Sequence, residues 1–508
     1  MKIISITNII PYVLAIGMLF SGCIKEEEPI APVVITEASH VNLFIWNGMN
    51  EYYLWNDKVP GLSNTSYSKG DSLNSFLNKY SDPEDLFYDL LYRADTIDKW
   101  SFIVDDSKQI DDWISGISET MGYDFMLGRI EKSNILFGFV RYIYKGSPAE
   151  KSGLKRGDIF YKVNDQQITV NNYPTLLFAT PAYELSFATV IDTDTGYKIT
   201  PIDKAMNMAA IEMQENPICL DTVFTFNNQK IGYLVYNGFN AEFDLQLNDV
   251  IQKFKDATID QMVLDLRYNG GGSVQSSIYL ASMLFGTDES KLFAKAQFNQ
   301  GFQASIISTE GAQVFNDNFT RTIKATATTP ATPINTLNLQ KIYIIVSDNT
   351  ASASELLING LRPYMEVKVV GINTYGKYVG SFTITDDKVT SNKWAMQPIV
   401  VKYANSLGET DFVNGLTPNI RAEEDIANLL PFGDSNETLL KAVLDDMQGM
   451  AVTASTLKSA KMGLRKVADS QDFQRFSRDM YVNPEKFKSL NKADQEGRGG
   501  SSASKPVY

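Results

Sequence analysis

The sequence predicts a multidomain protein of the mixed α/β (α+β) class, built from three folded regions with different residue patterns. Its 508 residues are enough for about three domains. Residues 37–112 repeat apolar side chains at helical spacing, residues 113–205 read as strands and turns, and residues 206–450 alternate apolar strands with helices. With 44% hydrophobic and 21% charged residues, the composition is that of a globular protein with large cores.

The first 22 residues have the pattern of a bacterial export signal. Lys2 supplies the positive end, and residues 9–20 form a mostly apolar run that is too short for a spanning helix of about 20 residues. The run ends in Phe20-Ser21-Gly22-Cys23, which resembles the lipobox of bacterial lipoproteins. The resemblance implies lipidation of Cys23 and a lipid anchor in the cell envelope, at the outer membrane, with a periplasmic or a cell-surface face. A cleaved signal followed by an accidental cysteine is the alternative.

Residues 23–36 form an acidic, proline-bearing tether without usable periodicity. Its start, Lys25-Glu26-Glu27-Glu28, resembles the surface-export signals of lipoproteins from the Bacteroides group, and a plain acidic linker is the other interpretation.

The charge and the rare residue types exclude several classes of function. A formal charge of −14 without a cluster of Lys and Arg disfavours nucleic-acid binding. Only two cysteines and one histidine occur, which excludes ordinary Cys/His zinc sites, and no metal or cofactor is expected. If Cys23 carries lipid, Cys219 is alone and no intrachain disulfide is possible.

Residues 37–112 predict a helical N-terminal domain. Asp82-Pro83 reads as an N-cap followed by proline in the first helical turn. The aromatic stripe that precedes it is more typical of a core than of a ligand site. Its members are Phe44, Trp46, Met49, Tyr52, Tyr53 and Trp55.

The centre of the second region is the stretch at 146–168, in which Ser147 starts a short helix, 159–163 reads as a strand and Asn164-Asp165 as a tight turn. The order of glycines, helix and strand resembles a circularly permuted PDZ domain. Such domains bind peptide ends by adding a strand to a sheet edge. The resemblance places the carboxylate-binding loop near Gly122, Tyr123 and Phe125. Asp124 stands where glycine is usual and would repel a terminal carboxylate.

In the third region, the runs 230–239, 261–269 and 341–347 are apolar and bounded by polar residues or glycine, as buried strands are. A helix is expected after Gly272 and another after Ser352, which indicates α/β crossovers. The remaining residues, 451–508, read as a polar C-terminal tail with a disordered end.

The stretch TASASE at 350–355 has two interpretations. Ser352 and Glu355 have the spacing of a capping box ahead of an apolar helix. The same position, at a helix N-terminus, also suits a nucleophile because free N–H groups and the helix dipole favour developing negative charge.

Together with LDLRYNGGG at 264–272 and GINTYGKYVGS at 371–381, this stretch and the PDZ-like region resemble the C-terminal processing peptidases, or tail-specific proteases, in a Bacteroides-type lipoprotein subgroup. The resemblance implies an α/β core of the ClpP/crotonase-like type and a serine endopeptidase that acts through an acyl-enzyme. Ser352 matches the family nucleophile and Lys377 the family base. Ser381 stands where a lysine-orienting glutamine is usual.

The residues themselves agree with a Ser–Lys dyad. A serine hydroxyl needs a base, and His40, the only histidine, lies near the tether. A free lysine is neutral in only about one molecule in 2,500 at pH 7, so Lys377 would have to be partly buried. The N–H of Ala353 is a natural oxyanion donor, and the family resemblance places a second donor in the glycine loop, at Gly271. Asp265 and Arg267 are expected to pair structurally.

Two alternatives remain open. Gly371 to Lys377 fits a phosphate-binding loop, but Tyr378 replaces the required Ser or Thr and a strand is expected where a helix should follow. The other alternative is a non-catalytic relative that binds peptides in the same groove. The expected partners are protein or peptide substrates, with no nucleic acid, and the oligomeric state is left open.

Overall fold

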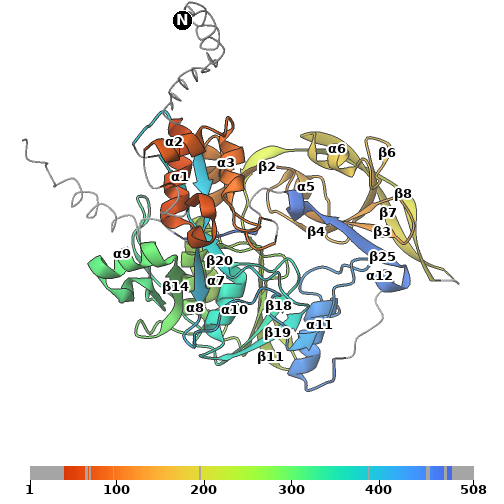
Figure 1. Cartoon of the computed structure of the whole chain (residues 1–508). Coiled ribbons are helices and arrows are strands. Elements are labelled where there is room, and N and C mark those ends of the chain that lie inside the picture. The colour runs from red at the N-terminus through yellow and green to blue at the C-terminus, as the bar shows by residue number, and fades with distance from the viewer. Residues whose placement is uncertain are drawn as a thin grey trace, which may run out of the picture.

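The computed structural model describes residues 39–482 except 63–66, 68–69, 95, 194–195, 387, 453–457 and 474–477. The predicted export signal, Cys23 and nearly all of the tether lie outside the described residues, as do residues 483–508 of the predicted tail. Figure 1 shows the helices of the N-terminal region above the core sheets, with the PDZ-like region to one side. None of the described helices is both long and apolar enough to cross a membrane.

The N-terminal region is helical, as predicted. Asp82 caps α3 by accepting from the Glu84 N–H at 2.9 Å, with Pro83 in the first turn. Four members of the aromatic stripe are buried, and Tyr52 and Trp55 are partly buried. The stripe shares one hydrophobic cluster with the third region, so this region has no separate core. The elements are α1 (His40–Tyr52), α2 (Asp71–Leu77), α3 (Pro83–Asp89), β1 (Phe102–Val104) and α4 (Lys108–Ile114).

The second region forms an antiparallel sheet in the order β25-β3-β4-β5-β7-β8. The predicted short helix is α5, capped by Ser147, and the predicted strand is β5, followed by a turn in which Asn164 and Asp165 both have positive φ. The sheet continues four residues beyond the predicted boundary at 205, to Ala209. The elements are β2 (Ile117–Thr120), β3 (Tyr123–Ile130), β4 (Phe137–Ile143), α5 (Pro148–Lys151), β5 (Ile159–Val163), β6 (Gln166–Gln167), α6 (Tyr173–Phe178), β7 (Ala182–Thr193), β8 (Gly196–Ala209) and β9 (Ile211–Gln214).

The third region contains a six-stranded sheet in the order β10-β11-β12-β18-β19-β24. The strands from β11 to β24 are parallel, and only β10 is antiparallel to its neighbour. Helices lie in the connections from β11 to β19, as parallel crossovers require, whereas the connection from β19 to β24 passes through strands of the other sheets. The three predicted apolar runs are β11, β12 and β18, and the two predicted helices are α8 and α10. The elements are β10 (Ile218–Phe226), β11 (Gln229–Tyr236), α7 (Asp244–Asp256), β12 (Gln261–Asp265), β18 (Lys341–Val346), α10 (Ala353–Leu361), β19 (Glu366–Gly371), β24 (Ile420–Arg421) and α11 (Thr438–Met447).

A second six-stranded sheet, β13-β26-β20-β23-β14-β15, packs in the same core. Strand β1 of the N-terminal region pairs with β22 of this part, which ties the two regions together. The elements are β13 (Gly272–Ser273), α8 (Val274–Leu284), β14 (Leu292–Phe298), α9 (Gln300–Glu310), β15 (Asn316–Asn318), β16 (Thr322–Ile323), β17 (Thr332–Pro333), β20 (Val379–Ser381), β21 (Ile384–Thr385), β22 (Ala395–Gln397) and β23 (Ile399–Ala404).

The prediction that 451–508 is only a polar tail is wrong for its middle part. After α12 (Lys458–Lys461), strand β25 (Leu464–Asp469) joins the PDZ-like sheet beside β3, and β26 (Met480–Tyr481) inserts between β13 and β20. Figure 1 shows β25 lying across the PDZ-like region. The polar composition gives no sign of these strands, because each is short and is stabilised by pairing with distant parts of the chain. The partner of β25 is more than three hundred residues away.

Candidate active site

Three loops meet at the carboxyl ends of the adjacent parallel strands β12, β18 and β19. The glycine loop (Gly270–Gly272) follows β12, the loop with Ser352 follows β18, and the loop with Lys377 follows β19. Carboxyl ends of neighbouring parallel strands lie at one edge of a sheet, which is where α/β folds place their sites. The topology therefore brings together residues that are more than a hundred positions apart in the sequence.

Ser352 is the N-cap residue of α10 and has an unusual backbone, with φ +66° and ψ −117°. Such a conformation is strained for a residue with a side chain and is found mostly at functional sites. The side chain is fully buried, and its Oγ has no hydrogen-bond partner among the described residues. A buried hydroxyl without a partner, held at a helix N-terminus, is free to react with a group that enters the site.

Glu355 links the serine loop to the lysine loop. One of its oxygens accepts from the backbone N–H of Ser352 and from the backbone N–H of Lys377, each at 2.8 Å. Its other oxygen accepts from the Gly376 N–H at 2.8 Å and from Thr374 Oγ1. Burial raises the pKa of Glu355 to about 7, although these four hydrogen bonds favour the ionised form. Glu355, the second residue of the capping box, therefore also fixes the position of the two loops relative to each other.

The ammonium group of Lys377 is completely buried. Its Nζ forms an ion pair with the carboxylate of Asp479, close to the start of β26, and lies 5.4 Å from the centre of the Trp100 ring. Burial lowers the pKa of Lys377 below the usual lysine value, and the negative charges of Asp479 and Asp98 oppose that shift. A lysine in this setting loses its proton more readily than a solvated lysine, and Asp479 opposes that loss.

The predicted oxyanion residues lie against the serine. A Cβ placed on Gly271, which has φ +113°, would be 2.9 Å from Ser352 Oγ and 3.0 Å from the Ala353 nitrogen. Only glycine fits this approach. As the first residue of α10, Ala353 has an N–H without a partner inside the helix. The Gly271 N–H instead donates to Asn269 Oδ1 at 2.9 Å, and this bond must open before Gly271 can donate to a substrate.

Ser381, considered as a residue that orients the lysine, is buried in β20 but bonds elsewhere. Its hydroxyl donates to the Met480 carbonyl and accepts from Gln397 Nε2, both at 3.2 Å. This hydroxyl therefore holds the strand β26 in place. The side chain that holds the lysine Nζ is Asp479 instead.

A cavity of about 470 Å³ opens beside the glycine loop, between the core and the strand β2. This volume is within the usual range for ligand sites of roughly 300–1,000 Å³. Both polar atoms of the Asn237 amide are buried at its wall without a hydrogen-bond partner among the described residues. The space is therefore open next to Gly271 and offers a polar group to an incoming chain.

The predicted carboxylate loop of the PDZ-like region lies at the start of β3. Gly122 has φ +81°, which fits its close contact with Ser147, and the hydroxyl of Tyr123 lies 2.5 Å from that of Tyr183. The N–H of Phe125 donates to Ser470 Oγ at 3.2 Å. Asp124 is buried and paired with Arg141 through both carboxylate oxygens, so it does not present the free negative charge that the sequence suggested.

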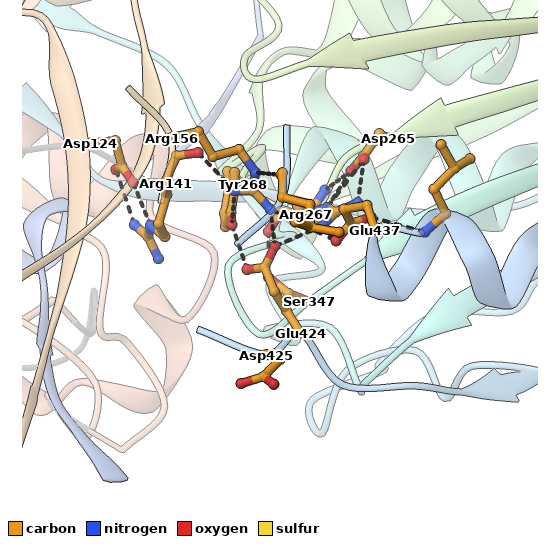
Figure 2. Close-up of polar contacts among 12 residues, drawn as sticks. Asp124, Arg141, Arg156, Asp265, Arg267, Tyr268, Ser347, Glu424, Asp425 and Glu437 are labelled. Atoms are coloured by element: carbon orange, nitrogen blue, oxygen red, sulfur yellow. Dashed lines mark hydrogen bonds and ion pairs between the residues drawn. The ribbon is translucent and has the colours of Figure 1, made fainter. Parts of the chain in front are cut away.

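A buried network of ion pairs connects the PDZ-like region with the core (Figure 2). Arg267 pairs with Asp265, as predicted, and with Glu437, each at 2.7 Å. Glu424 accepts from both Arg267 and Arg156, and Arg156 belongs to the PDZ-like region. Asp265 is the last residue of β12 and Arg267 follows two residues later, so the network supports the strand that leads into the glycine loop.

Two other predictions concern residues outside this site. His40 lies in the first turn of α1, about half exposed, with its Nε2 2.5 Å from Asp386 Oδ2. The residues after Lys377 form the strands β20 and β21 (Ile384–Thr385), as predicted, where a phosphate-binding loop would have a helix. Among the described residues, no group of three or more His, Cys, Asp and Glu side chains is placed to hold a metal ion.

Two residues at the lysine were not predicted from the sequence. Trp100 belongs to the N-terminal region and Asp479 to the supposed tail, and neither lies in a motif. The order Asp479-Met480-Tyr481-Val482, one acid before a short apolar run, was the only available signal, and it is too short to indicate a buried strand.

Three family models match this chain. A model of peptidase family S41 matches residues 230–422, and a model of the peptidase S41 N-terminal domain matches residues 40–102. A PDZ domain model matches residues 139–177. The matches follow each other in the order of the three regions of the structure.

Relatives of known type show the same similarity. Over 303 residues the chain is 24% identical to the carboxy-terminal processing protease CtpA of Bacillus subtilis (strain 168). This match covers 58% of this chain and 55% of that protein. Over 341 residues it is 24% identical to a CtpA-like serine protease of Staphylococcus aureus (strain COL), with 65% and 60% covered. The matched part thus spans less than two thirds of the length of these relatives.

Among solved structures, an S41 protease from Bacteroides fragilis NCTC 9343 has a TM-score of 0.63 and 25% sequence identity to this chain. The superposition covers 80% of this chain and 98% of that structure. The similarity therefore extends over the N-terminal, PDZ-like and core regions together.

Proposed function

Because this chain belongs to peptidase family S41, we propose that it is a serine endopeptidase whose nucleophile is Ser352 and whose base is Lys377. One observation carries the proposal. The unpaired Ser352 hydroxyl lies against Gly271 at the N-terminus of α10, and Glu355 ties its backbone to that of the buried Lys377. These are the parts that a serine nucleophile, its base and an oxyanion site require.

In the proposed reaction, Ser352 Oγ attacks the carbonyl carbon of the scissile peptide bond while neutral Lys377 Nζ takes the hydroxyl proton. The Ala353 N–H and an N–H of the glycine loop stabilise the negative oxygen of the tetrahedral intermediate. The C–N bond then breaks, and the leaving amine receives the proton from Lys377. Water, deprotonated by the same lysine, attacks the resulting ester and releases the second product together with Ser352.

The substrates we propose are proteins or peptides. The cavity next to Gly271 supports this class by its position and volume, and the PDZ domain match supports it because PDZ domains bind peptide ends. We further propose a lipid anchor on Cys23 that holds the enzyme in the cell envelope, at the outer membrane, and this rests on the sequence of the signal region alone.

A serine-directed fluorophosphonate probe tests the nucleophile. The full chain should be labelled at Ser352, and Ser352→Ala should lose the label and peptide hydrolysis together, because no other side chain supplies the attacking oxygen. Mass spectrometry of the labelled peptide locates the adduct. His40→Ala is the matched control and should keep nearly all activity, since its imidazole lies against Asp386. A Ser352 that stays unlabelled both in the full chain and after Asp479→Asn would instead support a non-catalytic peptide-binding relative.

Replacing Cys23 by alanine tests the anchor. The variant should leave the membrane fraction and appear in the soluble fraction, because a single lipidated cysteine is the proposed attachment. Fractionation of cells with an antibody against the chain measures this, and Cys219→Ala is the control that should stay with the membranes. Equal membrane binding of both variants would contradict the lipoprotein hypothesis.

A further inference from the structure

The described residues 464–473 and 478–482, here called the C-terminal segment, lie in both peptide-binding parts of the molecule. The first part, β25, pairs antiparallel with β3 from Leu464 opposite Ile130 to Asp469 opposite Met126. It therefore runs toward the predicted carboxylate loop. This is the edge and the direction in which a PDZ domain adds a peptide strand.

At the loop itself, the C-terminal segment takes the groups that a peptide end would use. Ser470 Oγ accepts from the Phe125 N–H at 3.2 Å and donates to Asp124 Oδ2 at 2.8 Å. The buried carboxylate of Asp469 forms an ion pair with Arg141. The segment thus supplies a negative group at the point where a peptide carboxylate would arrive.

An aromatic side chain of the segment docks on the helix that flanks this edge. The ring of Phe473 stacks on that of Phe178 in α6, with 4.0 Å between centroids, and lies 5.7 Å from Tyr173. Phe178 in turn stacks on Phe125 of β3. The contact is a surface contact rather than a core contact, because Phe473 remains 39% exposed.

The end of the segment crosses the candidate active site as an extended strand. Met480 pairs with Gly272, and Tyr481 pairs with Ser273 on one side and with Ser381 on the other. The preceding Asp479 forms the ion pair with Lys377. Asp479 also lines two cavities, the one beside the glycine loop and a second one lined by Trp100 and Tyr375, so the segment forms part of both walls.

We propose that the C-terminal segment is an internal ligand that occupies the PDZ groove and the catalytic groove at once and holds the peptidase latent. The proposal rests on the serine peptidase function proposed above. While Asp479 pairs with Lys377, its carboxylate favours the protonated amine, which cannot take the Ser352 proton. While β25 covers β3, a substrate tail cannot add its own strand. A protein or peptide tail that displaces the segment from the PDZ groove would thereby also release the lysine.

Two single variants in the full chain separate this proposal from a purely structural role. Asp479→Asn removes the negative charge that pairs with Lys377, and Phe473→Ala weakens docking at a site remote from the dyad. Each should raise the rate of fluorophosphonate labelling of Ser352 by about tenfold or more, because each shifts the population toward the open state. Asp165→Asn, at a carboxylate whose side chain is 88% exposed, is the control and should label like the wild type.

The direction of the Asp479→Asn effect is decisive. Slower labelling would show that Asp479 positions the lysine for catalysis, and the latency proposal would be overturned. Unchanged labelling in Phe473→Ala, folded by its thermal unfolding midpoint, would show that the segment is a fixed structural strand. If Phe473→Ala does not fold, Phe473→Leu keeps most of the apolar volume, loses the ring stacking and takes its place with the same expected direction.

A synthetic peptide with the sequence of residues 464–482 provides the second measurement. Added to the Asp479→Asn, Phe473→Ala double variant, it should slow labelling toward the wild-type rate, whereas a scrambled peptide should not. A peptide without effect would contradict the internal-ligand proposal. Absence of labelling in every variant, including the double variant, would instead contradict the serine peptidase function, so the two failures are distinguishable.

Discussion

Replacing Lys377 by methionine should lower kcat/KM for peptide hydrolysis by about a thousandfold or more, because the general base is lost. The experiment is best made in the Asp479→Asn background. In the wild type, removing the ammonium group would leave the carboxylate of Asp479 buried without its partner, and a folding defect could then be mistaken for a catalytic one. Methionine fills a similar volume, so the pocket under Trp100 stays packed.

The control for this variant is Lys253→Met, at a lysine whose side chain is 52% exposed. It should hydrolyse peptide like its parent, and both variants should bind a substrate peptide with unchanged affinity. Full hydrolysis by Lys377→Met would end the dyad hypothesis. Loss of nucleotide binding with retained hydrolysis would revive the phosphate-loop interpretation of Gly371 to Lys377.

The pH profile should carry the signature of the same lysine. Only the neutral amine accepts a proton, so kcat/KM should rise with pH and level off above the lysine pKa. Burial lowers that pKa, whereas Asp479 raises it. The midpoint of the rise should therefore lie below the usual lysine value of about 10.4, and it should move to lower pH in Asp479→Asn. A midpoint at the same pH in both proteins would mean that the titrating group is not Lys377.

Much of the candidate site could be predicted from the sequence, because its parts follow local rules. Glycines after a buried strand, a capping box before an apolar helix and a lysine after the next strand each have a recognisable pattern. Parallel crossovers then bring the carboxyl ends of β12, β18 and β19 to one edge of the sheet. The approach of Gly271 to Ser352 follows from that topology, although the two residues are distant in the sequence.

The partners of Lys377 could not be predicted in the same way. Asp479 directly precedes a strand of two residues, and Trp100 belongs to the N-terminal region, which shares one core with the protease sheets. Neither contact leaves a periodic pattern, because both depend on how distant parts of the chain pack. The hydrogen bond from the Gly271 N–H to Asn269 could not be predicted from the sequence either, since it depends on a single loop conformation.

Arg267→Met should destabilise the protein by about 3–5 kcal/mol, the cost of removing one partner from a buried ion pair. Arg267 is completely buried and pairs with Asp265, Glu424 and Glu437 (Figure 2). Without the guanidinium, these three carboxylates stay in the interior and lose a positive charge that offsets the cost of burying them. The matched control is Arg465→Met, at an arginine whose side chain is 70% exposed and pairs with Glu131, and it should cost less than about 1 kcal/mol.

The difference in the free energy of unfolding between Arg267→Met and the wild type should also depend on pH. Burial alone would raise the pKa of Glu424, but Arg156 and Arg267 outweigh it and hold the pKa at about 2. The pKa of Glu437 is lowered in the same way. A carboxyl group with a depressed folded-state pKa stabilises the fold above its unfolded pKa of about 4.3, and this contribution disappears as pH falls toward about 2. Urea unfolding of both proteins at pH 7 and at pH 3 measures this. The free energies of unfolding of the wild type and Arg267→Met should differ strongly at pH 7 and less at pH 3. An equal difference in unfolding free energy at both pH values would mean that Arg267 stabilises the protein through packing and not through its charge.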